Sequence, residues 1–141
     1  NLVEGSDFIV LPTTAQSRSI ELTGEMACML NKFDIPYAAL IVKADTRKKS
    51  SIQIAREILQ GFDIEVLRTE IPLLNAFENA ETEGVTVDRA VTKNGRSDRR
   101  RMSGFYAYSK ACDEIELLMP QRKVIPMPIG WNVSRLEDRC A

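Results

Sequence analysis

The sequence has 141 residues, of which 44% are hydrophobic and 28% are charged, and its formal net charge is −1 at pH 7. A chain of this length and composition is typical of one globular domain, which excludes disordered and fibrous classes. Because the net charge is close to zero, affinity for nucleic acid would have to come from a local cluster of basic residues.

Histidine is absent, which removes Ser-His and Cys-His nucleophile pairs and most zinc sites. The sequence also lacks both common glycine-rich phosphate-binding patterns, so we predict no catalytic residue and no metal site. Cys28, Cys112 and Cys140 show no paired spacing. The first two lie in apolar helical patterns, and we expect them to be buried free thiols. No signal peptide or long apolar run is present, which predicts a cytoplasmic protein.

The first half of the chain alternates between strand and helix patterns. Residues Asp7 to Pro12 form an apolar run of strand length. Tyr37 to Val42 form a second, uninterrupted one, typical of a strand buried on both faces of a parallel sheet. Between them the spacing predicts a helix with these residues on its inward face: Leu22, Met26, Met29, Leu30 and Phe33.

A second helix is predicted to begin at Ser50 or Ser51 and to end at Gly61. Its expected inward face consists of Ile52, Ala55, Ile58, Leu59 and Phe62. Residues Ile64 to Pro72 read as a third strand, and a short helix is predicted from Asn75, its expected cap, to Gly84.

Residues 85–98 are polar with little periodicity, which predicts a loop. The longest helix follows and ends at Pro120, with this expected inward face: Phe105, Tyr108, Cys112, Ile115 and Met119. We expect Phe105, Tyr106 and Tyr108 to form core and rim of this helix and not a platform for base stacking. The domain organisation predicted is an α/β portion over residues 1–119 and a proline-containing tail over residues 120–141.

The alternation of strands and helices predicts an α/β fold in which a parallel sheet is flanked by helices. Three strands would make a small sheet with two long edges, so the sheet looks unfinished. Ligands of open α/β sheets lie beyond the carboxyl ends of the strands. Here those ends are residues 12–15, 43–47 and 71–74.

Four segments, in this order, resemble motifs of the ParA/MinD-type P-loop ATPases: GSDFIVLPTTAQSRSIELT, AALIVKADTRKK, EVLRTEIPLLNAFENAETEGVTV and AYSKACDEIELL. The resemblance runs from about Gly5 to Leu118. It implies a P-loop NTPase-like sheet that is incomplete, because the family's Walker A loop and switch aspartate would precede Asn1. By this resemblance the chain is the C-terminal half of a ParA-like ATPase that acts in DNA partition or plasmid DNA processing.

The resemblance also implies cofactors and a base site. ATP and Mg²⁺ would bind the intact family protein but not this chain strongly by itself, since nothing here cradles phosphates. The wall beside the adenine base would consist of Val42, Lys43, Asp45, Ile71 and Pro72. Val42 stands where the family usually has Asn, and Asp45 either accepts a hydrogen bond from the base or stays in water. The alternative is a strand end that is merely solvated.

Two basic groups are the candidate DNA contacts: Arg47, Lys48 and Lys49, and then Arg96, Arg99, Arg100 and Arg101. The alternative is a solvated loop whose charge is offset by Asp98, Glu78, Glu81 and Glu83. The expected partners are non-specific DNA, a second copy of the chain and a partition-type adaptor protein, without a membrane. A non-catalytic α/β binding or regulatory module is the second hypothesis for the whole chain.

Overall fold

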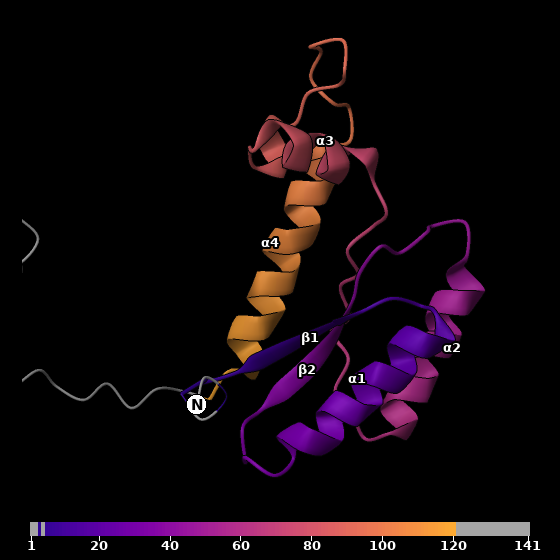
Figure 1. The fold of residues 1–141 in the computed structure, drawn as a ribbon, viewed down its shortest axis with the longest axis vertical. Helices are drawn as coiled ribbons and strands as arrows, with labels where there is room; N and C mark the ends of the chain where they lie inside the picture. Colours follow the sequence, from indigo (N-terminus) through magenta and orange to yellow (C-terminus); the bar gives the residue numbers. More distant parts are fainter. Residues whose placement is uncertain (1–2, 4, 121–141) are drawn as a thin grey trace, which may run out of the picture.

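The computed structural model describes residue 3 and residues 5–120 (Figure 1). The predicted tail therefore lies outside the described residues from position 121 onwards. The elements in chain order are β1 (Ile9–Thr13), α1 (Ser17–Leu30), β2 (Tyr37–Ile41), α2 (Lys49–Gly61), α3 (Asn75–Glu83), the 3-10 turn η1 (Val87–Arg89) and α4 (Arg101–Leu118). The predicted α/β class is confirmed.

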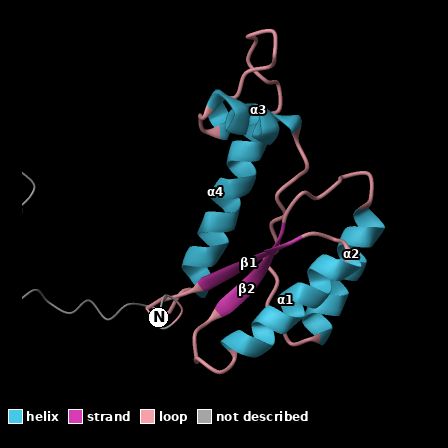
Figure 2. Ribbon diagram, in the orientation of Figure 1, coloured by secondary structure: helices cyan, strands magenta, loops and turns pink. Residues whose placement is uncertain are grey.

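β1 and β2 form a parallel sheet, with Ile9 opposite Tyr37 and Thr13 opposite Ile41. The helices α1 and α2 cover one face of this sheet and α4 covers the other (Figure 2). Ala39 and Ile41 of β2 belong to the core cluster under α1 and α2, whereas the intervening Ala38 and Leu40 pack on the α4 side. β2 is thus buried on both faces, as its apolar sequence predicts.

The prediction of a continuous third strand over residues 64–72 is wrong. This segment runs beside β2 but pairs with it only at two isolated parallel bridges, Ala39 with Val66 and Ala44 with Pro72. The N–H of Leu67 donates to the Ala39 carbonyl, and the N–H of Ile71 donates to the Ile41 carbonyl. Between these two hydrogen bonds the segment advances by four residues, whereas β2 advances by two. The extra residues form a bulge that interrupts the strand.

The predicted inward face of α1 is also wrong. The residues buried against the sheet are Ile20, Thr23, Ala27 and Leu30, and only the last of these was expected. The side chains of Leu22, Met26, Met29 and Phe33 are 38–50% exposed. Thr23 and Ala27 are small enough to let the helix axis approach the sheet closely, which explains why this face and not the bulkier one is buried.

α4 shows the same preference for small buried residues, whereas α2 buries two large side chains. Ile52, Ala55 and Leu59 of α2 are buried as predicted, whereas Ile58 and Phe62 are exposed. On α4 the buried residues are Gly104 and Ala111, with Ala107 and Ile115 half-buried. The other expected inward residues of α4 are exposed: Phe105, Tyr108, Cys112 and Met119. Cys28 is exposed too, so the expectation of two buried thiols is corrected.

Substitution of Gly104 by Ala is expected to lower the free energy of unfolding by about 1 kcal/mol. A Cβ at this position would lie 2.9 Å from Cζ of Phe77 and 3.0 Å from Cγ2 of Val87, so these side chains or α4 itself would have to shift. Overpacking of this kind costs about 1–3 kcal/mol, and the gain in helix propensity of about 1 kcal/mol offsets only part of it.

The matched control is Gly61→Ala at the end of α2, where an added Cβ has no neighbour within 4 Å. That variant should unfold at the same or a slightly higher temperature than the original chain. Thermal denaturation followed by circular dichroism measures both, and a Gly104→Ala variant as stable as Gly61→Ala would contradict the packing of α4 on Phe77.

Candidate functional site

The carboxyl end of β2 is tied into the fold through its backbone. The N–H of Val42 donates to the Thr13 carbonyl at 2.7 Å, and the Val42 side chain packs in the cluster between the sheet and α4. Lys43, which follows, has a φ of +52° and is exposed. The chain therefore turns sharply at the strand end, and the Val42 side chain packs against the α4 side of the sheet.

Asp45 is held by the residue two positions further along the chain. The N–H and Nε of Arg47 each donate to Oδ1 of Asp45 at 3.0 Å, and Nη2 of Arg47 donates to Oδ2 at 2.9 Å. These hydrogen bonds lower the pKa of Asp45 from 3.8 to about 2. The Asp45 carboxylate thus closes the turn that leads into α2, in a solvent-exposed pair that is compatible with the expected solvated strand end.

Removal of the Arg47 side chain is expected to raise the pKa of Asp45 from about 2 towards 3.8. Because the folded-state pKa is lowered, the stabilisation from this pair is fully present above pH 4 and is lost as the pH falls through about 2. Titration of the Asp45 side-chain carboxyl by NMR, in the original chain and in Arg47→Ala, measures the shift. An unchanged pKa in the variant would contradict the pairing. Arg18→Ala, which breaks only the surface pair with Glu21, is the control.

The remaining residues of the expected base wall divide between core and surface. Ile71 is 3% exposed and bonds through its backbone to Ile41 and Ala44, so it is a core residue and not a ligand contact. Pro72 is half-buried and lines a cavity, together with Ala44. Among the five predicted residues, only Pro72 has a place on the surface where a ligand could bind in this cavity.

This open cavity has a volume of about 630 Å³ and lies between the carboxyl end of β2, the bulged segment and α4. Its lining residues are Ala44, Thr46, Arg68, Thr69, Glu70, Pro72, Ser103, Tyr106, Ala107 and Lys110. Two of the three predicted strand ends, residues 43–47 and 71–74, therefore do border a cavity. At the third, Thr13 and Thr14 instead bond to the Ser19 hydroxyl at the start of α1. Sequence reasoning missed the α4 residues of the lining; the signal was their helical spacing, from Ser103 through Tyr106 and Ala107 to Lys110.

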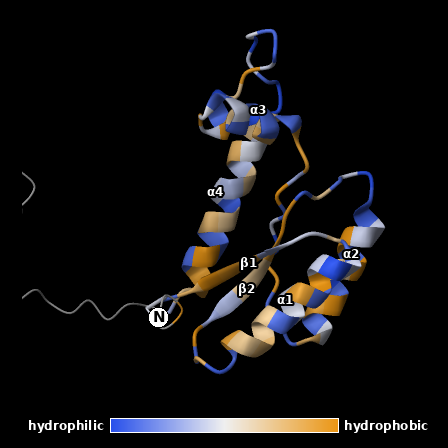
Figure 3. Ribbon diagram, in the orientation of Figure 1, coloured by the Kyte–Doolittle hydropathy of each residue, from blue (hydrophilic) through white to orange (hydrophobic). Residues whose placement is uncertain are grey.

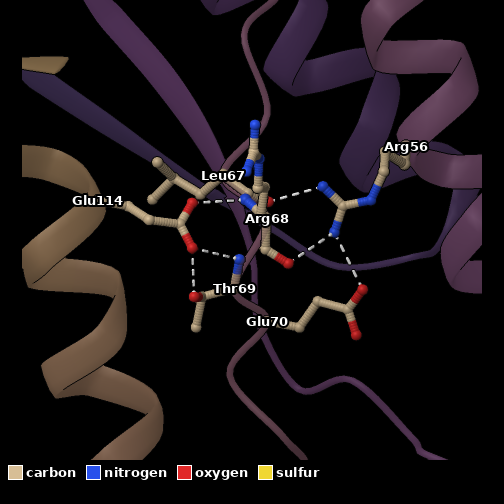
Figure 4. A network of polar contacts seen from close by, with 6 residues as sticks. All are labelled: Arg56, Leu67, Arg68, Thr69, Glu70 and Glu114. Atoms are coloured by element: carbon tan, nitrogen blue, oxygen red, sulfur yellow. Dashed lines mark hydrogen bonds and ion pairs between the residues drawn. The ribbon is translucent and has the colours of Figure 1, made fainter. Parts of the chain in front are cut away.

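The cavity is shaped by side chains that hold the bulge from both sides (Figure 4). From α4, Oε2 of Glu114 accepts from the N–H of Arg68 at 2.6 Å, and Oε1 accepts from the N–H of Thr69 at 2.8 Å and from its hydroxyl. From α2, Nη1 of Arg56 donates to the Leu67 carbonyl at 2.6 Å, and Nη2 pairs with Glu70 at 3.0 Å. These contacts satisfy the backbone groups that the interrupted strand leaves unpaired.

The two predicted basic groups flank the cavity. Arg47, Lys48 and Lys49 follow Thr46 at the start of α2 and are exposed. Arg99 and Arg100 are exposed and Arg101 is half-buried, two positions before Ser103 on α4, whereas Arg96 lies on the exposed and mostly hydrophilic loop between α3 and α4 (Figure 3). Arg47 to Lys49 and Arg99 to Arg101 thus lie close in sequence to Thr46 and Ser103 of the cavity lining, whereas Arg96 does not.

The acidic residues expected to offset the second basic group do not pair with it as ion pairs. Asp98 is buried, and its carboxylate accepts from the N–H of Arg100 at 2.8 Å and from Nδ2 of Asn79 at 3.0 Å. Within the described part of the chain, no ion pair joins the Glu78, Glu81 or Glu83 carboxylates to these arginines. The side chains of Arg99 and Arg100 are exposed, whereas Arg101 is half-buried and its Nη1 donates to the Asp98 carbonyl at 3.0 Å.

The fold and cavity define an α/β domain with a two-stranded parallel sheet and a cavity, lined by Arg68 and Lys110, at the carboxyl end of β2. Comparison with models of known protein families and with curated protein sequences finds no match. Among residues 3 and 5–120, no cluster of His, Cys, Asp or Glu side chains could hold a metal ion. None of the helices described there has the length and apolar character needed to span a membrane.

Proposed function

We propose that the chain is the C-terminal part of a ParA-like ATPase involved in DNA partition or plasmid DNA processing. In this proposal it contributes a wall beside the nucleotide base, part of the surface of a homodimer and non-specific DNA contacts. The observation that carries the proposal is the difference between the two edges of the sheet, because it indicates where further strands would join.

The outer edge of β1 is open. Ile9 donates to the Pro36 carbonyl and Thr13 accepts from Val42, so the alternate residues turn away from β2: Val10 presents an N–H and a carbonyl, and Pro12, which has no N–H, presents a carbonyl. In the described part of the chain no strand pairs with that edge. The opposite edge, along residues 67–69, is closed by Arg56 and Glu114. An open edge is normally protected; Pro12 protects the end of this one, and the unprotected part around Val10 supports a partner strand at β1.

The exposed flank of α1 lies on the same side as the open edge. Gly24 faces α2, where an added Cβ would lie 3.7 Å from the Phe62 ring. Helical periodicity places the exposed residues Leu22, Met26 and Met29 on the opposite flank, away from α2 and towards the side where β1 is outermost. A strand paired with β1, together with its own helix, would cover these residues. The ATP-binding half of a ParA-like protein would supply such strands.

ATP and Mg²⁺ belong to the proposal only through that other half. The described residues offer Ala44 and Pro72 beside a base, but no metal cluster and no glycine-rich loop for the phosphates. Ala44 and Pro72 could contact a nucleotide base, but they offer no side-chain ligand for Mg²⁺. Alone, the chain should therefore not hydrolyse ATP. A partition-type adaptor protein would be a further partner of the intact protein.

The coding sequence upstream of Asn1 tests the proposal most directly. A loop of the type Lys-Gly-Gly-x-Gly-Lys followed by Ser or Thr, within the same reading frame, is the expected finding. An initiator Met directly before Asn1 would overturn the proposal and favour the non-catalytic α/β module instead.

Replacement of Arg99, Arg100 and Arg101 by Ala is expected to weaken the retention of duplex DNA at low salt. Each phosphate contact on duplex DNA contributes about 0.9 to the slope of log K against log salt, so the slope should fall by about 2 to 3. Electrophoretic mobility shifts at several salt concentrations measure this slope. The double variant Arg18→Ala/Lys32→Ala, which removes exposed charges from α1 and the turn that follows it, is the control and should leave the slope unchanged. Unchanged retention in the triple variant would remove this group from the DNA surface.

A further inference from the structure

We infer that the cavity between β2, the bulged segment and α4 binds single-stranded DNA, with Tyr106 stacking on an unpaired base and with Lys110 and Arg68 contacting phosphates. The inference rests on the proposed DNA-binding function and adds to it a substrate form and a site. None of these three residues was among the DNA contacts expected from the sequence.

The charge of the cavity favours an anionic ligand. Lys110 and Arg68 both line it, and within the described residues neither side chain forms an ion pair. The one carboxylate in the lining, Glu70, is already paired with Arg56 at 3.0 Å. The hydroxyl groups of Thr46 and Ser103 add polar groups at the two walls. Phosphate groups are the anions that two flexible cations and neighbouring hydroxyls commonly bind.

The aromatic ring distinguishes a nucleic-acid strand from a simple anion. Tyr106 is 57% exposed and lines the cavity one helical turn from Lys110 and from Ser103. The expectation that Tyr106 is a core or rim residue of α4 therefore misses its place in the cavity. Its ring meets that of Phe105 edge-on, with centroids 5.9 Å apart, so it is supported on one side only. A cationic groove that also presents an aromatic ring is the arrangement that single-strand-binding proteins use.

The surroundings of the cavity indicate how a strand would continue beyond it. Arg47 to Lys49 follow Thr46 on one wall, and Arg99 to Arg101 precede Ser103 on the other. A strand that crosses the cavity would thus meet exposed cations at both ends. Bases paired in a duplex are stacked on one another and cannot reach a ring in a concave site, whereas an unpaired base can. The concave shape therefore favours the single strand over the duplex.

Fluorescence anisotropy with a labelled oligothymidylate of about 15 nucleotides, a length near the upper site size of such proteins, tests the inference on the full chain. Tyr106→Ala should weaken binding about tenfold, and Tyr106→Phe, which keeps the ring, should restore it. The control Tyr108→Ala removes an exposed ring of the same helix that packs on Phe77, outside the cavity, and should leave the affinity unchanged.

The phosphate contact is tested by salt. Lys110→Gln should lower the slope of log K against log salt by about 0.7, whereas Lys32→Gln, an exposed lysine outside the cavity, should not change it. Circular dichroism of each variant establishes that it is folded before binding is compared.

Two outcomes overturn the inference. The first is that Tyr106→Ala binds the oligothymidylate as tightly as the original chain does. The second is that duplex DNA displaces the oligothymidylate and that Lys110→Gln leaves the salt dependence of oligothymidylate binding unchanged. Duplex retention that still depends on Arg99 to Arg101 would then leave the proposed function standing. Suppose instead that single-strand binding needs Tyr106 but the upstream sequence lacks a phosphate loop. That result would support the proposed DNA site in the cavity and overturn the proposal that the chain is part of an ATPase.

Discussion

Replacement of Glu114 by Ala is expected to lower the free energy of unfolding by about 3 kcal/mol, the largest loss that we expect from a single polar side chain of this protein. The Glu114 carboxylate accepts from the backbone N–H groups of two successive residues, Arg68 and Thr69, and from the Thr69 hydroxyl. No regular strand pairing is available to those N–H groups, because the segment bulges there. Without the carboxylate they lose a charged acceptor in a partly buried position.

The chemistry of the acceptor makes Glu114→Gln informative. In this variant one of the two carboxylate oxygens is replaced by an NH₂ group, which faces a backbone N–H and cannot accept a hydrogen bond from it. We expect Gln to recover about half of the loss, because one oxygen acceptor remains. Chemical denaturation at pH 7 measures both variants. Glu116→Ala removes the same charge from an exposed site on α4 and serves as the control; a Glu114→Ala variant as stable as Glu116→Ala would contradict the role of the carboxylate.

The same contact predicts a dependence on pH. Partial burial raises the pKa of Glu114, but the hydrogen bonds from Thr69 and Arg68, with the nearby Arg68 charge, lower it further, so that it lies below its ordinary value. A group whose pKa is lower in the folded state stabilises the protein above its unfolded-state pKa and loses that contribution as the pH falls. The stability difference between the original chain and Glu114→Ala should therefore shrink steadily below about pH 4.5.

The positions of the elements could be predicted from the sequence, because apolar runs and helix ends are local signals. The strand around Tyr37, the end of α2 at Gly61 and the end of α3 at Gly84, whose φ is +65°, all lie where local patterns place them. The interruption of the expected third strand could not be predicted from local patterns, because it involves a contact with Glu114, which lies 45 residues from Thr69 along the chain.

The buried faces of the helices were harder to predict for a different reason. Hydrophobic periodicity selects the largest apolar side chains, whereas on α1 and α4 small residues such as Ala27 and Ala111 are also buried against the sheet. The same difference explains the candidate site. The strand ends at Ala44 and Pro72 follow from the topology. Tyr106 and Lys110 line the cavity because α4 packs on the sheet through its own residues Ala107 and Ala111.

Replacement of Asp98 by Ala is the second large effect expected, with a loss of about 2 kcal/mol in the free energy of unfolding. Asp98 is 9% exposed and joins two elements, because Oδ2 accepts from Nδ2 of Asn79 on α3 and Oδ1 accepts from the N–H of Arg100 just before α4. Its carbonyl also accepts from Nη1 of Arg101 at 3.0 Å. Loss of the carboxylate leaves the Asn79 amide and the Arg100 N–H without their partner.

The reciprocal exchange Asn79→Asp/Asp98→Asn separates hydrogen bonding from charge at this position. An Asn at position 98 can still accept from the Arg100 N–H through Oδ1, while its NH₂ group donates to an Asp at position 79. In the single variant Asp98→Asn the Asn79 amide can turn its oxygen towards the new NH₂ group, so only the charge of the acceptor is lost; the variant should lose about 1 kcal/mol, and the double variant should recover most of it. Thermal denaturation measures the cycle.

Because Asp98 lies directly before the basic group Arg99 to Arg101, this cycle also bears on function. Retention of duplex DNA should fall in Asp98→Ala, as the turn that presents these arginines loosens, and should return in the exchanged double variant. If retention instead rises in Asp98→Ala, the carboxylate acts on DNA mainly through its negative charge and not by holding the arginines in place. The exchange keeps the total charge constant, so it tells these two effects apart.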